Sequence, residues 1–148
     1  KRQGLEIPIL GSDTLDSNKV LEAAAGSDVQ LYVSTFYQEG GSPEFDDGIK
    51  AWLNEDSTAM TNNGGNDTIA AVTAMGYDAY YVALEALKAA GSTDKAAVKA
   101  ALPDVTYTGV SGSIAFDEQG DAIRDTAYIK TADTANNAWT LETVQTVE

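Results

Sequence analysis

The sequence predicts an α/β fold, and three observations predict it. Short apolar runs rich in β-branched residues alternate with helical stretches near the start of the chain. One long helical pattern fills the middle, and the last third changes to alternating strand patterns separated by turns. The predicted element order is therefore β-α-β-α-α-α-β-β-β. With 148 residues, 43% of them hydrophobic, the chain is long enough to bury a core.

The first three elements form a strand, a helix and a strand. Residues 7–10 are an apolar run that ends in a turn at residues 11–13, which predicts a buried strand delivering its carboxyl end into a loop. Asp16 and Ser17 can cap the helix that follows. Residues 29–36 alternate and contain many β-branched and aromatic side chains, so they predict a second strand.

Three helices are expected next. Residues 42–44 combine a capping hydroxyl, a proline at the first helical position and an acid near the positive end of the helix dipole. Residues 54–67 are polar and predict a loop with room for one helical turn. Residues 68–90 have apolar side chains at helical spacing and predict the longest helix. A short helix follows over residues 94–102.

Gly76 lies inside the predicted long helix. A glycine there costs about 1 kcal/mol relative to alanine. Its presence predicts either a bend in the helix or a close approach to the backbone.

The last third of the chain predicts three strands. They cover residues 113–116, 127–131 and 139–147, where side chains alternate between apolar and polar. Turns at residues 117–120 and 136–137 separate them.

Composition excludes several classes of function. The net charge of −14 would repel nucleic acid and anionic lipid, so neither is expected as a partner. The chain has no Cys and no His, which removes thiol chemistry, the commonest general base and the commonest transition-metal ligand. Residues 117–121 resemble a calcium loop only superficially, because the alternating oxygen ligands are missing. No metal and no cofactor are predicted.

The chain is expected to be a piece of a longer protein. No apolar run is long enough to span a membrane, and no export signal stands at the start. Residues 1–4 instead have the pattern of a helix end that leads directly into a strand.

Three places are candidates for ligand binding. Ligands of open α/β sheets collect beyond the carboxyl ends of strands, where Ser12 and Asp13 lie; Asp13 can bind an ammonium group or simply satisfy the backbone of its turn. Tyr37 can line a cleft at the end of the second strand or pack in the core. Asp78 can face a pocket or make a structural hydrogen bond.

Three groups of sequence motifs, taken in their order along the chain, resemble those of the leucine/isoleucine/valine-binding proteins. These are extracytoplasmic receptors of ABC importers with the type I periplasmic binding protein fold. The resemblance covers nearly the whole chain. The motifs are Ile7-Pro8-Ile9-Leu10-Gly11-Ser12-Asp13; then Gly76-Tyr77-Asp78-Ala79-Tyr80-Tyr81, Glu85-Ala86-Leu87 and Ala90-Gly91-Ser92-Thr93-Asp94; then Gly109-Val110-Ser111-Gly112 with Phe116-Asp117-Glu118-Gln119-Gly120-Asp121.

This resemblance implies two parallel-sheet α/β sandwich lobes, joined by three crossings and closed over a ligand by hinge motion. It assigns residues 1–35 to the second lobe, 36–124 to the first lobe and 125–148 to the second lobe again. The chain is then an incomplete, C-terminal fragment, and the remainder of its own chain supplies the other wall of the pocket. The hinge residues are expected to be Thr35, Phe36 and Ala122.

The resemblance also implies that Asp13 takes the ammonium group of a branched-chain or other neutral amino acid. It further implies that the protein lies outside the cytoplasm and that its partner is an ABC transporter permease. Two alternatives are a ligand-sensing receptor domain of the same fold and an enzyme. The receptor would need a fused transmembrane or cytoplasmic segment. The enzyme would need a nucleophile and base pair, which Asp13 and Tyr37 do not provide.

Overall fold

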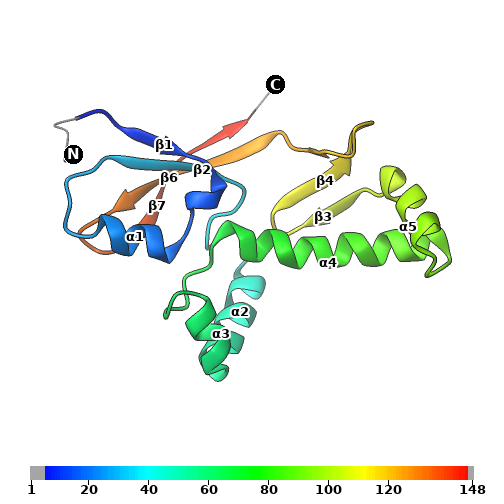
Figure 1. The fold of residues 1–148 in the computed structure, drawn as a ribbon, viewed down its shortest axis with the longest axis horizontal. Helices are drawn as coiled ribbons and strands as arrows, with labels where there is room; N and C mark the ends of the chain where they lie inside the picture. The colour runs from blue at the N-terminus through cyan, green and yellow to red at the C-terminus, as the bar shows by residue number, and fades with distance from the viewer. Residues whose placement is uncertain (1–5, 147–148) are drawn as a thin grey trace.

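The computed structural model describes residues 6–146, and the helix end predicted at residues 1–4 lies outside them. The described chain forms two sheets with helices beside them (Figure 1). The strands are β1 Ile9–Gly11, β2 Leu31–Thr35, β3 Tyr107–Gly109, β4 Gly112–Phe116, β5 Ala122–Ile123, β6 Thr126–Asp133 and β7 Ala138–Thr146. The helices are α1 Asn18–Ala24, α2 Pro43–Glu55, α3 Ser57–Asn62, α4 Ala71–Ala90 and α5 Lys95–Ala101, with 3₁₀ turns at Asp13–Leu15 and Leu102–Asp104.

The first sheet has the order β1-β2-β6-β7. β1 and β2 are parallel, as expected for two strands joined through helix α1. β6 and β7 return from the far end of the chain and add to β2 antiparallel. The sheet is therefore mixed, and its parallel part is confined to β1 and β2 among the described residues.

The second sheet has the order β3-β4-β5 and is antiparallel throughout. It lies beside the long helix α4, while α2 and α3 lie on the other side of that helix (Figure 1). Sequence analysis predicted β4 but missed β3 and β5, which have three and two residues. The chain passes from this sheet back to the first sheet between Ile123 and Thr126.

Local signals set several helix ends, although the Ser42 hydroxyl that was expected to cap α2 makes no cap hydrogen bond. Ser17 caps α1, its hydroxyl accepting a hydrogen bond from the Val20 backbone N–H. Asp94 caps α5, and Gly91 ends α4 in the left-handed conformation. The polar segment after α2 holds one short helix, α3, which Asp56 caps.

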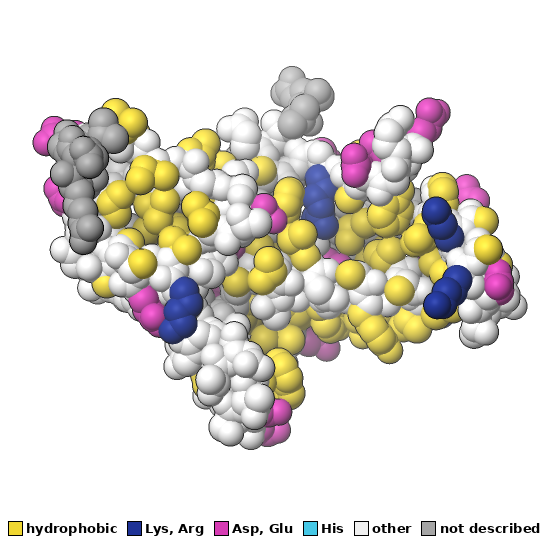
Figure 2. Space-filling view, in the orientation of Figure 1, with side chains coloured by type: hydrophobic (Ala, Val, Ile, Leu, Met, Phe, Trp, Pro, Cys, Tyr) yellow, Lys and Arg dark blue, Asp and Glu magenta, His cyan; other side chains and the backbone are white. Residues whose placement is uncertain are grey.

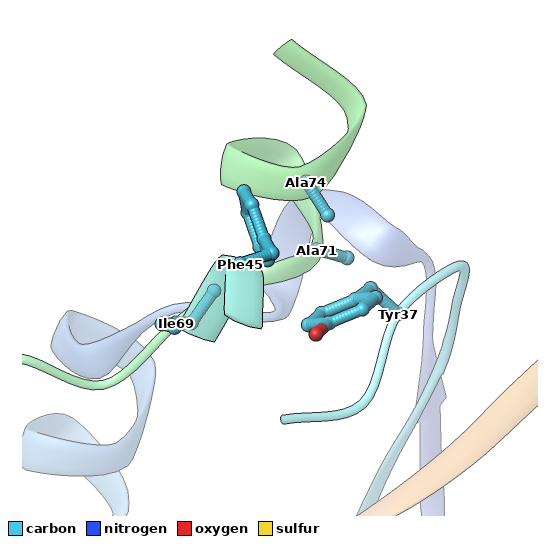
Figure 3. Close-up of a cluster of buried hydrophobic side chains, with 5 residues drawn as sticks. All are labelled: Tyr37, Phe45, Ile69, Ala71 and Ala74. Atoms are coloured by element: carbon cyan, nitrogen blue, oxygen red, sulfur yellow. The ribbon is translucent and has the colours of Figure 1, made fainter. Parts of the chain in front are cut away.

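Two buried clusters form the core. Tyr37 and Phe45 meet edge to face at 5.6 Å between ring centroids, against Ile69 and the start of α4 (Figure 3). The second cluster joins α4 to the small sheet and consists of Val82, Ala86, Val105 and Ile114.

Large apolar side chains also lie on the surface. Figure 2 shows hydrophobic surface over the region of β1 and along α4. The most exposed among the described residues include Ile7, Leu10, Val72, Tyr80 and Ile123. Exposed apolar surface of this kind is typical of faces that contact a partner, a ligand or another segment. No helix in the described part of the chain is both long and apolar enough to cross a membrane.

Candidate functional site

The turn after β1 presents Asp13 at the edge of the first sheet. The turn is closed by two backbone hydrogen bonds, from Leu15 N–H to the Ser12 carbonyl and from Asp16 N–H to the Asp13 carbonyl, both 3.0 Å. The Ser12 hydroxyl is engaged within the turn, 2.8 Å from the Thr14 hydroxyl. The Asp13 side chain is half-buried, and no side-chain hydrogen bond to another described residue involves it. Its carboxylate is therefore available to a ligand.

Asp16, the last residue of this turn, lines a cavity of about 220 Å³, and Asp13 is not among the lining residues. One wall is formed by the start of α1, from Asp16 to Lys19, and the other by the start of α4, from Ala70 to Thr73. Residues 61–64 at the end of α3 complete it. Val72 contributes an apolar side chain that is 55% exposed. The cavity is large enough for a small molecule and lies between segments far apart in the sequence.

A buried carboxylate holds the two walls together. Asp16 Oδ2 accepts hydrogen bonds from the Thr35 hydroxyl at 3.0 Å, the Ala71 backbone N–H at 3.2 Å and the Lys130 ammonium at 2.9 Å. The side chains of Asp16 and Lys130 are only 1% and 3% exposed. A buried ion pair of this kind needs such additional donors, because each charge has lost its water.

Sequence analysis treated Asp16 as a candidate helix cap, and this was wrong. Ser17 makes the cap, while the Asp16 carboxylate turns inward to the ion pair. Asp16 and Lys130 are 114 residues apart, so no local pattern could have joined them.

Tyr37 is engaged in the core rather than displayed in the cavity beside Asp16. Its ring packs in the first buried cluster, and its hydroxyl donates to Asp46 Oδ1 at 2.7 Å and accepts from the Ser42 N–H at 3.1 Å. Burial and the Asp46 carboxylate raise the pKa of Tyr37 above its ordinary value, so its hydroxyl stays neutral. These contacts are the core packing considered for Tyr37, and a contact with ligand stays a prediction.

Asp78 is fully buried and organises the β3–β4 turn. Its carboxylate accepts hydrogen bonds from the Val110 N–H at 2.9 Å, the Ser111 N–H at 2.8 Å and the Ser111 hydroxyl. Each carboxylate oxygen has a donor. This is the structural alternative considered for Asp78, and a contact with ligand stays a prediction.

The segments joining the two sheets meet at Arg124. Its guanidinium lies 5.0 Å from the centroid of the Phe36 ring and donates to the Ser111 carbonyl at 2.8 Å. Thr35 ends β2, and Phe36 follows it. Ala122, in contrast, is paired with Phe116 inside the small sheet, so the connection itself starts after β5.

Alanine substitutions at two glycines near Asp78 test the role of this turn. A Cβ atom on Gly109 would collide with the Asp78 carboxylate, whereas one on Gly76 would meet no described atom within 4 Å beyond its chain neighbours and the backbone of its own helix. The expected close approach at Gly76 is therefore absent from the described residues. We expect Gly109→Ala to lower the free energy of unfolding by about 1–3 kcal/mol through overpacking. Gly76→Ala, the matched control, should raise it by about 0.4–1 kcal/mol.

Urea denaturation followed by circular dichroism measures both changes. Equal effects of the two substitutions would contradict the role given to the Asp78 turn.

The described residues contain no group of three or more acidic side chains arranged to hold a metal ion. The turn carries the Asp13 carboxylate, which makes no side-chain hydrogen bond to another described residue, while the neighbouring cavity is lined mostly by polar side chains together with Ala70 and Val72.

Comparisons with known proteins find solved structures of similar fold. A leucine-binding protein of Thermotoga maritima matches 98% of this chain with a TM-score of 0.71 and 26% identity, over 39% of its own length. A branched-chain amino acid transporter substrate-binding protein of Streptococcus pneumoniae, solved with isoleucine, matches 99% with a TM-score of 0.63 and 20% identity, over 38% of its length. No curated protein is significantly similar in sequence.

The chain thus spans less than two fifths of the length of these solved relatives. A family model of periplasmic binding proteins matches residues 1–137. This chain belongs to the periplasmic binding protein family.

Proposed function

We propose that this chain is part of the solute-binding component of an ABC importer, which captures a neutral, branched-chain or similar amino acid outside the cytoplasm and presents it to a transporter permease. The membership in a family of binding proteins supports this proposal. The observation that carries it is the partly exposed Asp13 carboxylate, which no described side chain engages, at the carboxyl end of β1.

The charge balance at the turn supports an amino acid as ligand. Asp13 has no basic side chain bonded to it among the described residues, so it can accept a charge-assisted hydrogen bond from an α-ammonium group. The exposed Val72 at the cavity favours an uncharged side chain on the ligand. A leucine-binding protein and an isoleucine-bound protein stand among the structural relatives.

We further propose that the described chain is the C-terminal part of a longer, two-lobed protein. In this proposal residues 1–35 and 125–148 belong to the second lobe and residues 36–124 to the first. The pairing of β2 with β6 supports the division, since it brings the two outer segments into one sheet. The exposed apolar faces over β1 and α4 are then covered by the remainder of the chain.

A thermal-shift screen of the natural full-length protein tests the ligand class. We expect leucine, isoleucine or valine to raise the melting temperature, because ligand at a hundredfold excess over its dissociation constant stabilises by about 2.7 kcal/mol. Sugars and dicarboxylates serve as controls without an α-ammonium group. Stabilisation by these controls alone would contradict the proposed ligand.

A further inference from the structure

We infer that Asp16 and Lys130 are positioning residues for ligand binding: their buried ion pair fixes the Asp13 turn against α4 and so sets the geometry in which Asp13 meets an ammonium group. This inference rests on the proposed function, because it assumes that Asp13 binds the ligand.

Asp13 and Asp16 are connected through one turn. They are the ends of one tight turn, joined by the 3.0 Å hydrogen bond from the Asp16 N–H to the Asp13 carbonyl. The Asp16 side chain leaves the turn inward and is held by three donors on a single oxygen. The position of the Asp13 backbone therefore depends on where Asp16 is held.

The three donors to Asp16 come from three different elements. Thr35 ends β2, Ala71 begins α4 and Lys130 lies in β6. The Ala71 N–H is the contact that reaches across the cavity, since Ala70 and Val72 lie on its opposite wall. One carboxylate thus joins both walls of the cavity to the sheet.

The buried charge of Asp16 is compensated by Lys130. The Asp16 Oδ1 atom is buried and has no hydrogen-bond partner among the described residues, so the carboxylate depends on the Lys130 ammonium for compensation. Without Lys130 the carboxylate would gain by moving toward water, and the turn would move with it. A shift of an ångström is enough to impair a positioned contact.

A role in positioning can be separated from a role in stability by the ligand's ammonium group. If Lys130 acts through Asp13, removing Lys130 weakens the binding of leucine more than the binding of the α-hydroxy acid analogue of leucine, which lacks the ammonium group. A general loss of stability would weaken both ligands alike or neither.

The experiment is calorimetric titration of the natural full-length protein with leucine, with the analogue measured by competition. Lys130→Met removes the ion pair, and the milder Thr35→Val removes only one neutral donor to Asp16. Val82→Ala, in the second core cluster, is the control that lowers stability away from the turn.

We expect Lys130→Met to weaken the binding of leucine about tenfold and that of the analogue less than about threefold, since a lost charge-assisted contact is worth about tenfold in affinity. Thr35→Val should lower the ratio of leucine affinity to analogue affinity by about twofold to threefold. Val82→Ala should leave this ratio unchanged.

The inference would be overturned, while the proposed function stands, if the wild-type protein binds leucine and the variants keep its ratio of leucine affinity to analogue affinity. If Lys130→Met does not fold, an unchanged ratio in Thr35→Val overturns it. Wild-type protein that does not bind leucine, isoleucine or valine would overturn the proposed function and the inference with it.

Discussion

Lys130→Met is expected to lower the free energy of unfolding by about 3–5 kcal/mol, the usual cost of removing one partner of a buried ion pair. The methionine side chain fits the volume of the lysine stem but leaves the Asp16 carboxylate buried without its counter-charge. Most of the lost stability therefore comes from the uncompensated charge of Asp16. Adding Asp16→Asn to the Lys130→Met variant should recover part of the lost stability, because the amide oxygen still accepts from Thr35 and Ala71 without carrying a charge.

Lys88→Met is the matched control. Lys88 forms an ion pair with Glu85 on α4, but the two side chains are 68% and 40% exposed. Exposed pairs contribute about 0–1 kcal/mol, so the control should change stability by no more than this. Urea unfolding of each variant measures the difference. Similar losses in Lys130→Met and Lys88→Met would show that the Asp16–Lys130 pair is not the buried tether described above.

Asp13→Asn should weaken binding of a neutral amino acid by roughly tenfold to a hundredfold, since a hydrogen bond to a charged group contributes about 1.5–3 kcal/mol. The stability of the ligand-free protein should stay unchanged, because no described side chain depends on the Asp13 carboxylate. Calorimetry on the full-length protein measures the affinity. Asp47→Asn, an exposed acid on α2, controls for the loss of one negative charge. Unchanged affinity in Asp13→Asn would exclude Asp13 as the ammonium contact.

Sequence reasoning succeeded where the deciding interaction is local. Ser17 and Asp94 cap helices because a hydroxyl or carboxylate reaches a backbone N–H two or three residues ahead. Gly91 ends α4 because it adopts a left-handed conformation that other residues avoid. The two parallel strands followed from apolar runs around one helix.

Sequence reasoning failed where the deciding contacts are distant or the elements very short. β3 and β5 are too short to show alternation, and they exist because β4 lies between them. The buried pair joins residues from opposite ends of the chain, and a lone lysine in a strand gives no sign of its burial. For Tyr37 and Asp78 the sequence left a pocket and a structural role open, and their distant partners, Asp46 and Ser111, could not be read from local patterns.

A crystal structure of the natural full-length protein with a bound neutral amino acid tests directly whether Asp13 binds the ligand's ammonium group. The expected result is a ligand held between two lobes, beside the start of α1 and the start of α4, with its α-ammonium nitrogen about 2.7–2.9 Å from an Asp13 carboxylate oxygen, the distance of a charge-assisted hydrogen bond. A ligand bound elsewhere, or bound in that cavity with its ammonium group on another residue, would contradict the claim.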